Sequence, residues 1–213
     1  MVMKKTAAES LADANAGLSR RARNKLLTRA AILNAAKECF GKNGISGTTM
    51  DQIAHQADIA RATLFNYFPS KGDIVAALVE DLDEAFYADI NYLRRKPMSL
   101  RSRIEALFRR TGHAVEGSAP YIRTIVGASE LGWNENTGFS RFRRMTSVLQ
   151  EMLEDGLSTG ELREDIDIHI LAEVVTSSLV GIIHNWRMDE SYPVSKHMAE
   201  TGRFLASMVV KPF

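Results

Sequence analysis

Residues 61–74, RATLFNYFPSKGDI, combine hydrogen-bonding and aromatic side chains at a density that neither a core helix nor an ordinary surface helix needs. Arginine can donate two hydrogen bonds to a guanine, asparagine can bridge an adenine, and threonine can contact a base or a phosphate. Arg61, Thr63 and Asn66 therefore carry the groups with which a short helix reads base edges. The ring and hydroxyl of Tyr67 suit contact with the sugar–phosphate backbone.

The same segment must also pack against its own domain. Leu64 and Phe68 are four residues apart, so they share one face of a helix, and either Phe65 or Tyr67 extends that face. Lys71 opens the following helix, where its charge adds to the free amide groups and the helix dipole. This combination predicts a phosphate clamp beside a recognition helix.

Two elements must position this segment. Apolar residues at 32, 35, 36, 39 and 40 predict a helix that ends at 41–44, with Gly44 in a left-handed cap. Thr49 and Gln52 form a capping box that opens a short second helix, and Asp58 occupies the turn after it. A third helix covers about 60–68. Pro69 ends it, and a second capping box at Ser70 and Asp73 opens the next helix. Three helices in about 45 residues, two of them short and joined by a tight turn, indicate a helix-turn-helix module.

The rest of the chain is also predicted to be helical, which makes the fold class all-α. We expect an N-terminal three-helix helix-turn-helix DNA-binding domain, followed by a larger helical ligand-binding and dimerisation domain. The predicted domains are a flexible basic arm over 1–23, the DNA-binding domain over 24–72 and the effector-binding and dimerisation domain over 73–213. Helical periodicity predicts helices near 71–94, 100–115, 120–130, 139–155, 167–188 and 193–210, with a polar loop, LGWNENTG, over 131–138.

Charge is distributed unevenly between these parts. The net charge of the chain is +1, yet residues 20–72 hold nine Lys and Arg against three Asp and Glu, a net +6. Residues 73–213 hold 16 basic against 21 acidic residues, a net −5. A basic head (residues 20–72) on an acidic body (residues 73–213) favours a polyanionic partner for the head. Four cations just before the first predicted helix could follow the DNA backbone or enter the minor groove: Arg20, Arg21, Arg23 and Lys25.

Composition excludes several classes of protein. The 213 residues are 45% hydrophobic and 25% charged, as in an ordinary globular protein, and no apolar run approaches the ~20 residues of a membrane span. The N-terminus lacks the apolar core of a signal peptide, so we expect a cytoplasmic location and no membrane contact. Cys39 is the single cysteine, which leaves no disulfide framework and no cysteine-based zinc site.

Enzymatic motifs are also missing from the sequence. There is no phosphate-binding glycine loop, no G-x-S-x-G and no H-E-x-x-H. His169 and Glu173 lie one helical turn apart, but they lack the further ligands that a metal site needs. We therefore expect no catalytic activity, no cofactor and no metal.

Residues 29–79 resemble the DNA-binding domain of the TetR/AcrR family of transcriptional regulators. The resemblance rests on an ordered set of pieces: the AA..CF..G helix, the TT-x4-A start and TLFNYFPSK. Asp58 and Ala60 depart from the glycine turn and serine cap that the family often has, and Phe65 replaces a frequent tyrosine. The resemblance implies that the residues in contact with DNA are Thr48, Thr49, Arg61, Ala62, Thr63, Asn66, Tyr67 and Lys71.

For the body, the resemblance implies a homodimer on a palindromic double-stranded operator and release by a small-molecule effector. Apolar, aromatic and a few polar residues form a candidate pocket: Phe108, His113, Tyr121, Ile125, Glu130, Trp133, Phe142, Met145, His184 and Trp186. Small residues flanked by apolar ones on the last two helices form a candidate dimer interface, which could instead pack within one subunit: Ile170, Val174, Ser177, Ser178, Gly181, Ala199, Gly202, Leu205, Ala206 and Val209.

Two other functions stay open at this point. One is a DNA-binding dimer without a small-molecule ligand that acts through a protein partner. The other is a helical carrier or enzyme in which the basic head is structural.

Overall fold

The computed structural model describes residues 19–118, 120–131 and 135–211. Contacts divide the chain into two units, Met1–Ile74 and Val75–Phe213. The described residues form nine α-helices and no β-strand, apart from one isolated antiparallel bridge between Leu162 and Val210. The predicted all-α fold is confirmed.

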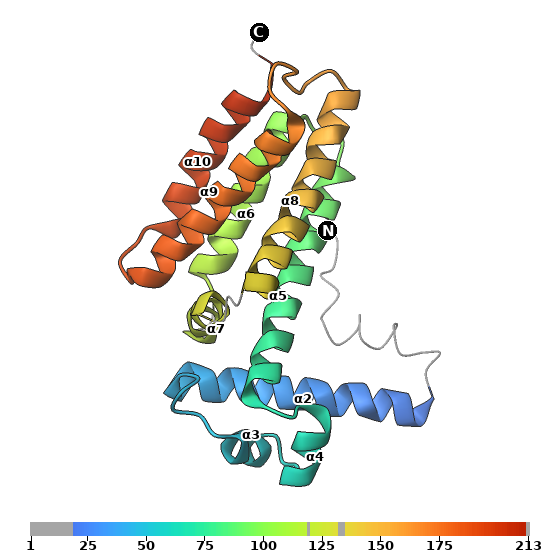
Figure 1. Cartoon of the computed structure of the whole chain (residues 1–213), viewed down its shortest axis with the longest axis vertical. Helices are drawn as coiled ribbons and strands as arrows, with labels where there is room; N and C mark the ends of the chain where they lie inside the picture. The colour runs from blue at the N-terminus through green and yellow to red at the C-terminus, as the bar shows by residue number, and fades with distance from the viewer. Residues whose placement is uncertain (1–18, 119, 132–134, 212–213) are drawn as a thin grey trace, which may run out of the picture. The chain divides into compact units, whose positions relative to one another are not determined.

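Figure 1 shows the order of the helices along the chain. The first unit contains α2 (Arg20–Asn43), α3 (Met50–Gln56) and α4 (Arg61–Tyr67). One continuous helix, α5 (Lys71–Arg94), carries the chain from the first unit into the second. The second unit continues with α6 (Leu100–Glu116), α7 (Pro120–Leu131), α8 (Glu135–Ser158), α9 (Ile168–Met188) and α10 (Val194–Val209).

Helix α2 begins earlier than the sequence suggested. The Ser19 hydroxyl accepts a hydrogen bond of 3.2 Å from the Ala22 amide and caps the helix, so Arg20 to Arg23 are helical. The prediction of a flexible arm over 1–23 is therefore wrong for residues 20–23, while residues 1–18 lie outside the described part of the chain. Helix α2 ends before Gly44, whose φ of 67° and ψ of 171° together are readily adopted by glycine alone and lie outside the left-handed helical region that the sequence predicted.

The two short helices follow the predicted local signals. Thr49 Oγ1 accepts from the Gln52 amide at 3.2 Å, and Gln52 Oε1 accepts from the Thr49 amide at 2.8 Å, which completes the capping box of α3. Asp58 has a φ of 53° in the turn, in the left-handed region that Asp tolerates better than most residues. Ala60 begins α4 without a side-chain cap.

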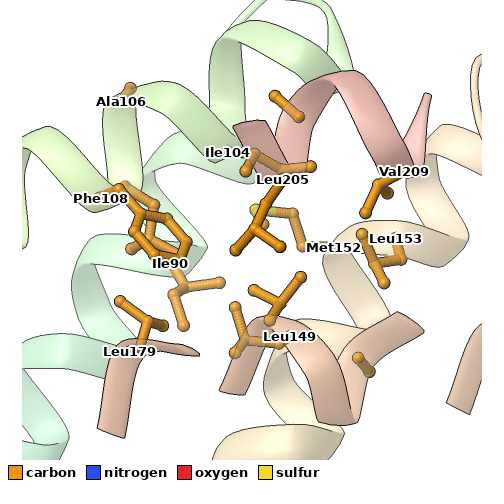
Figure 2. Packing of buried hydrophobic residues seen from close by; sticks show 14 of the residues in the cluster. Ile90, Ile104, Ala106, Phe108, Leu149, Met152, Leu153, Leu179, Leu205 and Val209 are labelled. Carbon is orange, nitrogen blue, oxygen red and sulfur yellow. The ribbon is translucent and has the colours of Figure 1, made fainter. Parts of the chain in front are cut away.

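Each unit has its own apolar interior. In the first unit, α2 packs on α3 and α3 on α4, with Ile32, Phe40, Ile53 and Leu64 fully buried. In the second unit, α6 packs closely on α10 and α8 packs on α9. Figure 2 shows side chains from α5, α6, α8, α9 and α10 meeting in one cluster. The labelled members are Ile90, Ile104, Ala106, Phe108, Leu149, Met152, Leu153, Leu179, Leu205 and Val209.

The polar segment over 131–138 differs from its prediction. Helix α8 begins at Glu135, so residues 135–138 are helical rather than part of a loop. No proline interrupts this stretch. Residues 132–134 lie outside the described part of the chain.

Helix α9 is long and apolar enough to cross a membrane by length and composition alone, with a mean hydropathy of 1.3 in its most apolar window. The core helix of a globular protein passes the same test. One face of α9 does belong to the core: Leu171, Ala172, Val175, Thr176, Leu179, Ile182 and Trp186 are buried.

Candidate nucleic-acid interface

Helix α4 has two different sides: a packing face directed into the first unit, and a face directed to solvent that was predicted to contact base edges, here called the reading face. Leu64 is fully buried and Phe68 is 5% exposed, so both point into the first unit. Arg61, Ala62 and Asn66 are exposed, and Thr63 and Tyr67 are half-buried. One side of α4 therefore offers hydrogen-bonding groups to solvent, while the other side fixes the helix on its domain.

Arg61 has partners on both of the short helices. Its Nη1 donates to Asp51 Oδ2 of α3 at 3.2 Å, and its Nε lies 3.2 Å from Asp51 Oδ1. Its Cζ lies 5.4 Å from the ring centroid of Phe65, one turn further along α4. The guanidinium group is thus bound between a carboxylate and an aromatic ring at the surface.

The side chain of Thr48, which the resemblance placed among the residues in contact with DNA, is bound inside its own domain. It is buried, and Oγ1 donates to the Gly44 carbonyl at 2.7 Å and lies 3.2 Å from the Cys39 carbonyl. Thr49 is exposed, but its hydroxyl caps α3.

Lys71 is bound to the chain itself. Its Nζ donates to the main-chain carbonyls of Ile45, at 2.5 Å, and Thr48, at 2.6 Å. These carbonyls belong to the segment between α2 and α3, so Lys71 ties the start of α5 to that segment. An ammonium group has three donors, and two of them are used here.

A basic hollow lies beside α4. It has a volume of about 1010 Å³, and its lining residues include four cations and no carboxylate. Arg29 is positioned by Phe68, since its Cζ lies 5.7 Å from that ring centroid. The full lining is Arg20, Arg21, Asn24, Lys25, Thr28, Arg29, Asn66 and Tyr67.

Sequence reasoning found only part of this hollow. Asn66 and Tyr67 were predicted as contacts, and Arg20, Arg21 and Lys25 were expected to follow the DNA backbone or enter the minor groove, whereas Asn24, Thr28 and Arg29 were not named. Arg21, Lys25 and Arg29 are each four residues apart and so lie on one helix face, which would have indicated a basic stripe if the helix had been extended to residue 20.

The predicted pocket residues do not come together as one described site. Phe108 and Ile125 are fully buried and Trp186 is 6% exposed, so these three belong to the interior of the second unit. His113 and His184 are exposed, and Tyr121, Phe142 and Met145 are half-buried. Glu130 lies in α7, but its side chain is outside the described part of the structure, as is Trp133.

The predicted dimer residues separate into two groups. Those of α9 lie largely at the surface: Ile170 is 52% and Val174 47% exposed, Ser177 and Gly181 are exposed, and Ser178 is half-buried.

Those of α10 pack within the chain, which corrects the prediction for them. Leu205 and Val209 point into the core cluster of Figure 2. Gly202 and Ala206 are buried, and Ala199 is half-buried. Small residues let two helices approach closely, and here the helix that approaches α10 is α6 of the same chain. Phe204 and Met208, which were not among the predicted residues, are 61% and 46% exposed on the other side of α10.

Among the described residues, no group of three His, Cys, Asp or Glu is placed to hold a metal ion. His169 and Glu173 are exposed neighbours, with 3.4 Å between Nε2 and Oε1. His169 Nδ1 lies 3.2 Å from Gln150 Oε1.

A family model described as bacterial regulatory proteins, tetR family, matches residues 32–78. This range covers α3, α4 and the buried face of α2. Two curated relatives extend the likeness over most of the chain. The fatty acid metabolism regulator protein of Bacillus subtilis (strain 168) is 20% identical over 163 residues, covering 75% of this chain and 83% of the relative. The nucleoid occlusion factor SlmA of Aliivibrio fischeri (strain MJ11) is 24% identical over 184 residues, covering 84% and 93%.

The fold has a similar solved structure. FadR from Bacillus subtilis, solved in complex with stearoyl-CoA, superposes with a TM-score of 0.70 at 20% identity and covers 84% of this chain and 98% of FadR. At this identity the likeness concerns the fold: an N-terminal helix-turn-helix domain followed by a helical domain.

Proposed function

This chain belongs to the TetR family of bacterial regulatory proteins, whose members regulate transcription by binding DNA, and from that premise we propose a homodimeric repressor that a small-molecule effector releases from a palindromic operator. We place it in the cytoplasm, where bacterial DNA lies, and we assign it no catalytic activity.

The observation that carries the DNA-binding function is the position of the basic hollow beside α4. The second helix of a helix-turn-helix lies in the major groove, and the flanking strand of the duplex passes beside it. Arg20, Arg21, Lys25 and Arg29 provide four cations at that place, and Asn66 and Tyr67 of α4 form the opposite wall. A phosphodiester backbone in the hollow would bring the exposed face of α4 against base edges.

The homodimer is proposed to form through the outer face of α9, extended by α10. Ile170, Val174 and Gly181 recur on one side of α9, and an added Cβ at Gly181 would meet nothing within 4 Å among the described residues of its own chain. Phe204 and Met208 add apolar surface on α10. A two-fold axis through this surface would present two copies of α4, which is why we propose a palindromic operator.

Unpaired polar atoms inside the second unit support an effector. The Tyr87 hydroxyl and Arg123 Nη1 are both buried, and neither has a hydrogen-bond partner among the residues that the structure describes. Burial raises the pKa of Tyr87, so its hydroxyl stays a donor. Because an unpaired buried donor costs free energy, a ligand that accepts a hydrogen bond there would be held. The related FadR was solved with stearoyl-CoA, which gives an acyl thioester as a first compound to try.

Release requires that the effector prefer one arrangement of the dimer over another. If effector titration never changes operator affinity, the release step fails while DNA binding stands.

A second candidate is a DNA-binding dimer that acts through a protein partner. It is favoured by the core packing of Phe108, Ile125 and Trp186, which we had expected to line a cavity. It is also compatible with a relative named as a nucleoid occlusion factor.

The experiment that tests the DNA-binding proposal is selection of bound fragments from random double-stranded DNA, with an Asn66→Ala/Tyr67→Ala variant in parallel. We expect a palindromic motif from the unmodified protein and none from the variant, because these side chains lie between the reading face and the basic hollow. Arg109→Ala, which removes an exposed cation from α6, serves as the control and should recover the same motif. Equal enrichment by folded Asn66→Ala/Tyr67→Ala protein would refute the interface.

A further inference from the structure

Arg61 and Asp51 form an ion pair across the two short helices of the helix-turn-helix, since Asp51 lies in the first turn of α3 and Arg61 begins α4. Both Asp51 oxygens lie 3.2 Å from guanidinium nitrogens of Arg61. The exposed Phe65 ring supports the guanidinium group from within α4, with 5.4 Å between Cζ and the ring centroid.

Stability does not account for this arrangement. The Arg61 and Asp51 side chains are 67% and 60% exposed, and ion pairs so exposed contribute little to the free energy of folding. Phe65 is 37% exposed, so its ring is only partly used for packing. Asp51 and Phe65 instead restrict the otherwise flexible side chain of Arg61 on the exposed face of α4.

A restricted arginine binds its target at a lower entropic cost, because fewer conformations are lost on binding. One of the five guanidinium donors is hydrogen-bonded to Asp51, which leaves others for a guanine that accepts at O6 and N7. The carboxylate also repels phosphate groups. A DNA sequence without the correct base pair therefore gains less from Arg61 than it would from an unpaired cation.

We propose that Asp51 and Phe65 are specificity-determining residues, which orient Arg61 toward a guanine in the operator and weaken its attraction to the phosphate backbone. This inference rests on the proposed DNA-binding function. Asp51 and Phe65 act through Arg61, and Arg61 is the residue that touches the base.

The test uses the operator obtained by selection, a set of single-base-pair variants of it, and unrelated duplex DNA, all at one fixed salt concentration. Arg61→Ala first identifies the base pair whose discrimination depends on Arg61. The discrimination ratio is the affinity for the operator divided by the affinity for the operator with that base pair substituted. We expect Asp51→Asn to reduce this ratio roughly tenfold, which lies within the discrimination of a good arginine–guanine contact. We expect the affinity of the Asp51→Asn protein for unrelated DNA to rise.

Two matched controls separate orientation from general charge. Asp58→Asn removes an acidic residue from the turn of the same module, and Asn also tolerates the left-handed conformation there, so the discrimination ratio should stay unchanged. Phe65→Tyr keeps the aromatic ring and should preserve the ratio, whereas Phe65→Leu should reduce it. Far-UV circular dichroism of each variant checks that the helices remain.

The inference is overturned if Asp51→Asn leaves the ratio at that base pair unchanged, or lowers it equally in an Arg61→Ala background. It is also overturned if the protein selects a motif in which no base pair depends on Arg61, and in that case the proposed function stands. If the unmodified protein selects no motif, the proposed function itself fails.

Discussion

Lys71 Nζ donates a hydrogen bond of 2.6 Å to the main-chain carbonyl of Thr48. A second carbonyl, that of Ile45, accepts from the same ammonium group. The residue that we expected to clamp a phosphate therefore also fixes the segment that leads into α3. The sequence could not distinguish these two roles of Lys71: contact with a phosphate and attachment of the segment before α3.

Substitution of Lys71 by Met is expected to lower the free energy of unfolding by about 1–2 kcal/mol, because two carbonyls lose a charged donor. If Lys71 acts only on the fold, the slope of log affinity against log salt should stay that of the unmodified protein. A direct phosphate contact would reduce the slope by about 0.9. Lys25→Met, in the basic hollow, is the matched comparison: we expect it to reduce the slope by about 0.9 with little change in stability.

Ala60 begins α4 without a side-chain cap, so Ala60→Ser should stabilise the protein by about 1 kcal/mol. For a chain of this size the melting temperature should rise by about 2–4 °C, as measured by calorimetry. Ala62→Ser introduces the same side chain inside the helix, where it caps nothing. An equal gain from Ala62→Ser would show that capping is not the cause.

Gly202 and Gly181 should respond oppositely to alanine. A Cβ at Gly202 would lie 2.6 Å from the Phe108 Cβ, so Gly202→Ala should destabilise the protein by about 1–3 kcal/mol in denaturant unfolding. A Cβ at Gly181 would meet nothing within 4 Å, so Gly181→Ala should leave the protomer at least as stable.

The proposed dimer gives Gly181→Ala a second effect. Sedimentation should show weaker dimerisation, because the added methyl group lies on the outer face of α9. Val174→Glu, on the same face, should give monomers. Dimers that persist in both variants would place the interface elsewhere.

Protonation of the Asp155 carboxyl should make the free energy of unfolding depend on pH. Hydrogen bonds from Arg94, at 2.8 Å from Nε and 3.2 Å from Nη2, lower the pKa of the Asp155 carboxyl from its ordinary value of 3.8. A carboxyl whose pKa is lower in the folded state stabilises the fold above its unfolded pKa, and that contribution is lost as the pH falls through the folded value.

Asp155→Asn should therefore cost roughly 1 kcal/mol at neutral pH, a value reduced by partial solvent exposure, and nearly nothing once the pH is well below 3.8. Urea unfolding across this range measures the difference. Asp165 has a pKa lowered to about 2 by the Arg163 hydrogen bond, but it is highly exposed, so Asp165→Asn should hardly move the urea midpoint. If Asp155→Asn lowered the free energy of unfolding by the same amount at every pH, the stabilising role given to the ionised Asp155 carboxyl would be contradicted.

The sequence by itself determined the helices of the first unit and their ends, except for the start of α2. The capping box of Thr49 and Gln52, the turn at Asp58 and the uncapped start at Ala60 depend on residues within a few positions of one another. Short-range signals of this kind can be recognised without the fold. Leu64 and Phe68 were also predicted to be buried, because their spacing defines one helix face.

The tertiary structure decided which partner each helix face and each polar side chain contacts. Gly202, Leu205 and Val209 satisfy the pattern of a helix–helix contact equally well within a chain or between chains, and only their packing on α6 selects the first. Thr48, Lys71 and the Asp51–Arg61 pair likewise depend on partners 4 to 26 positions away in the sequence. Helical periodicity specifies that a face is apolar or polar, but it carries no information on what the face meets, because that is set by contacts between distant segments.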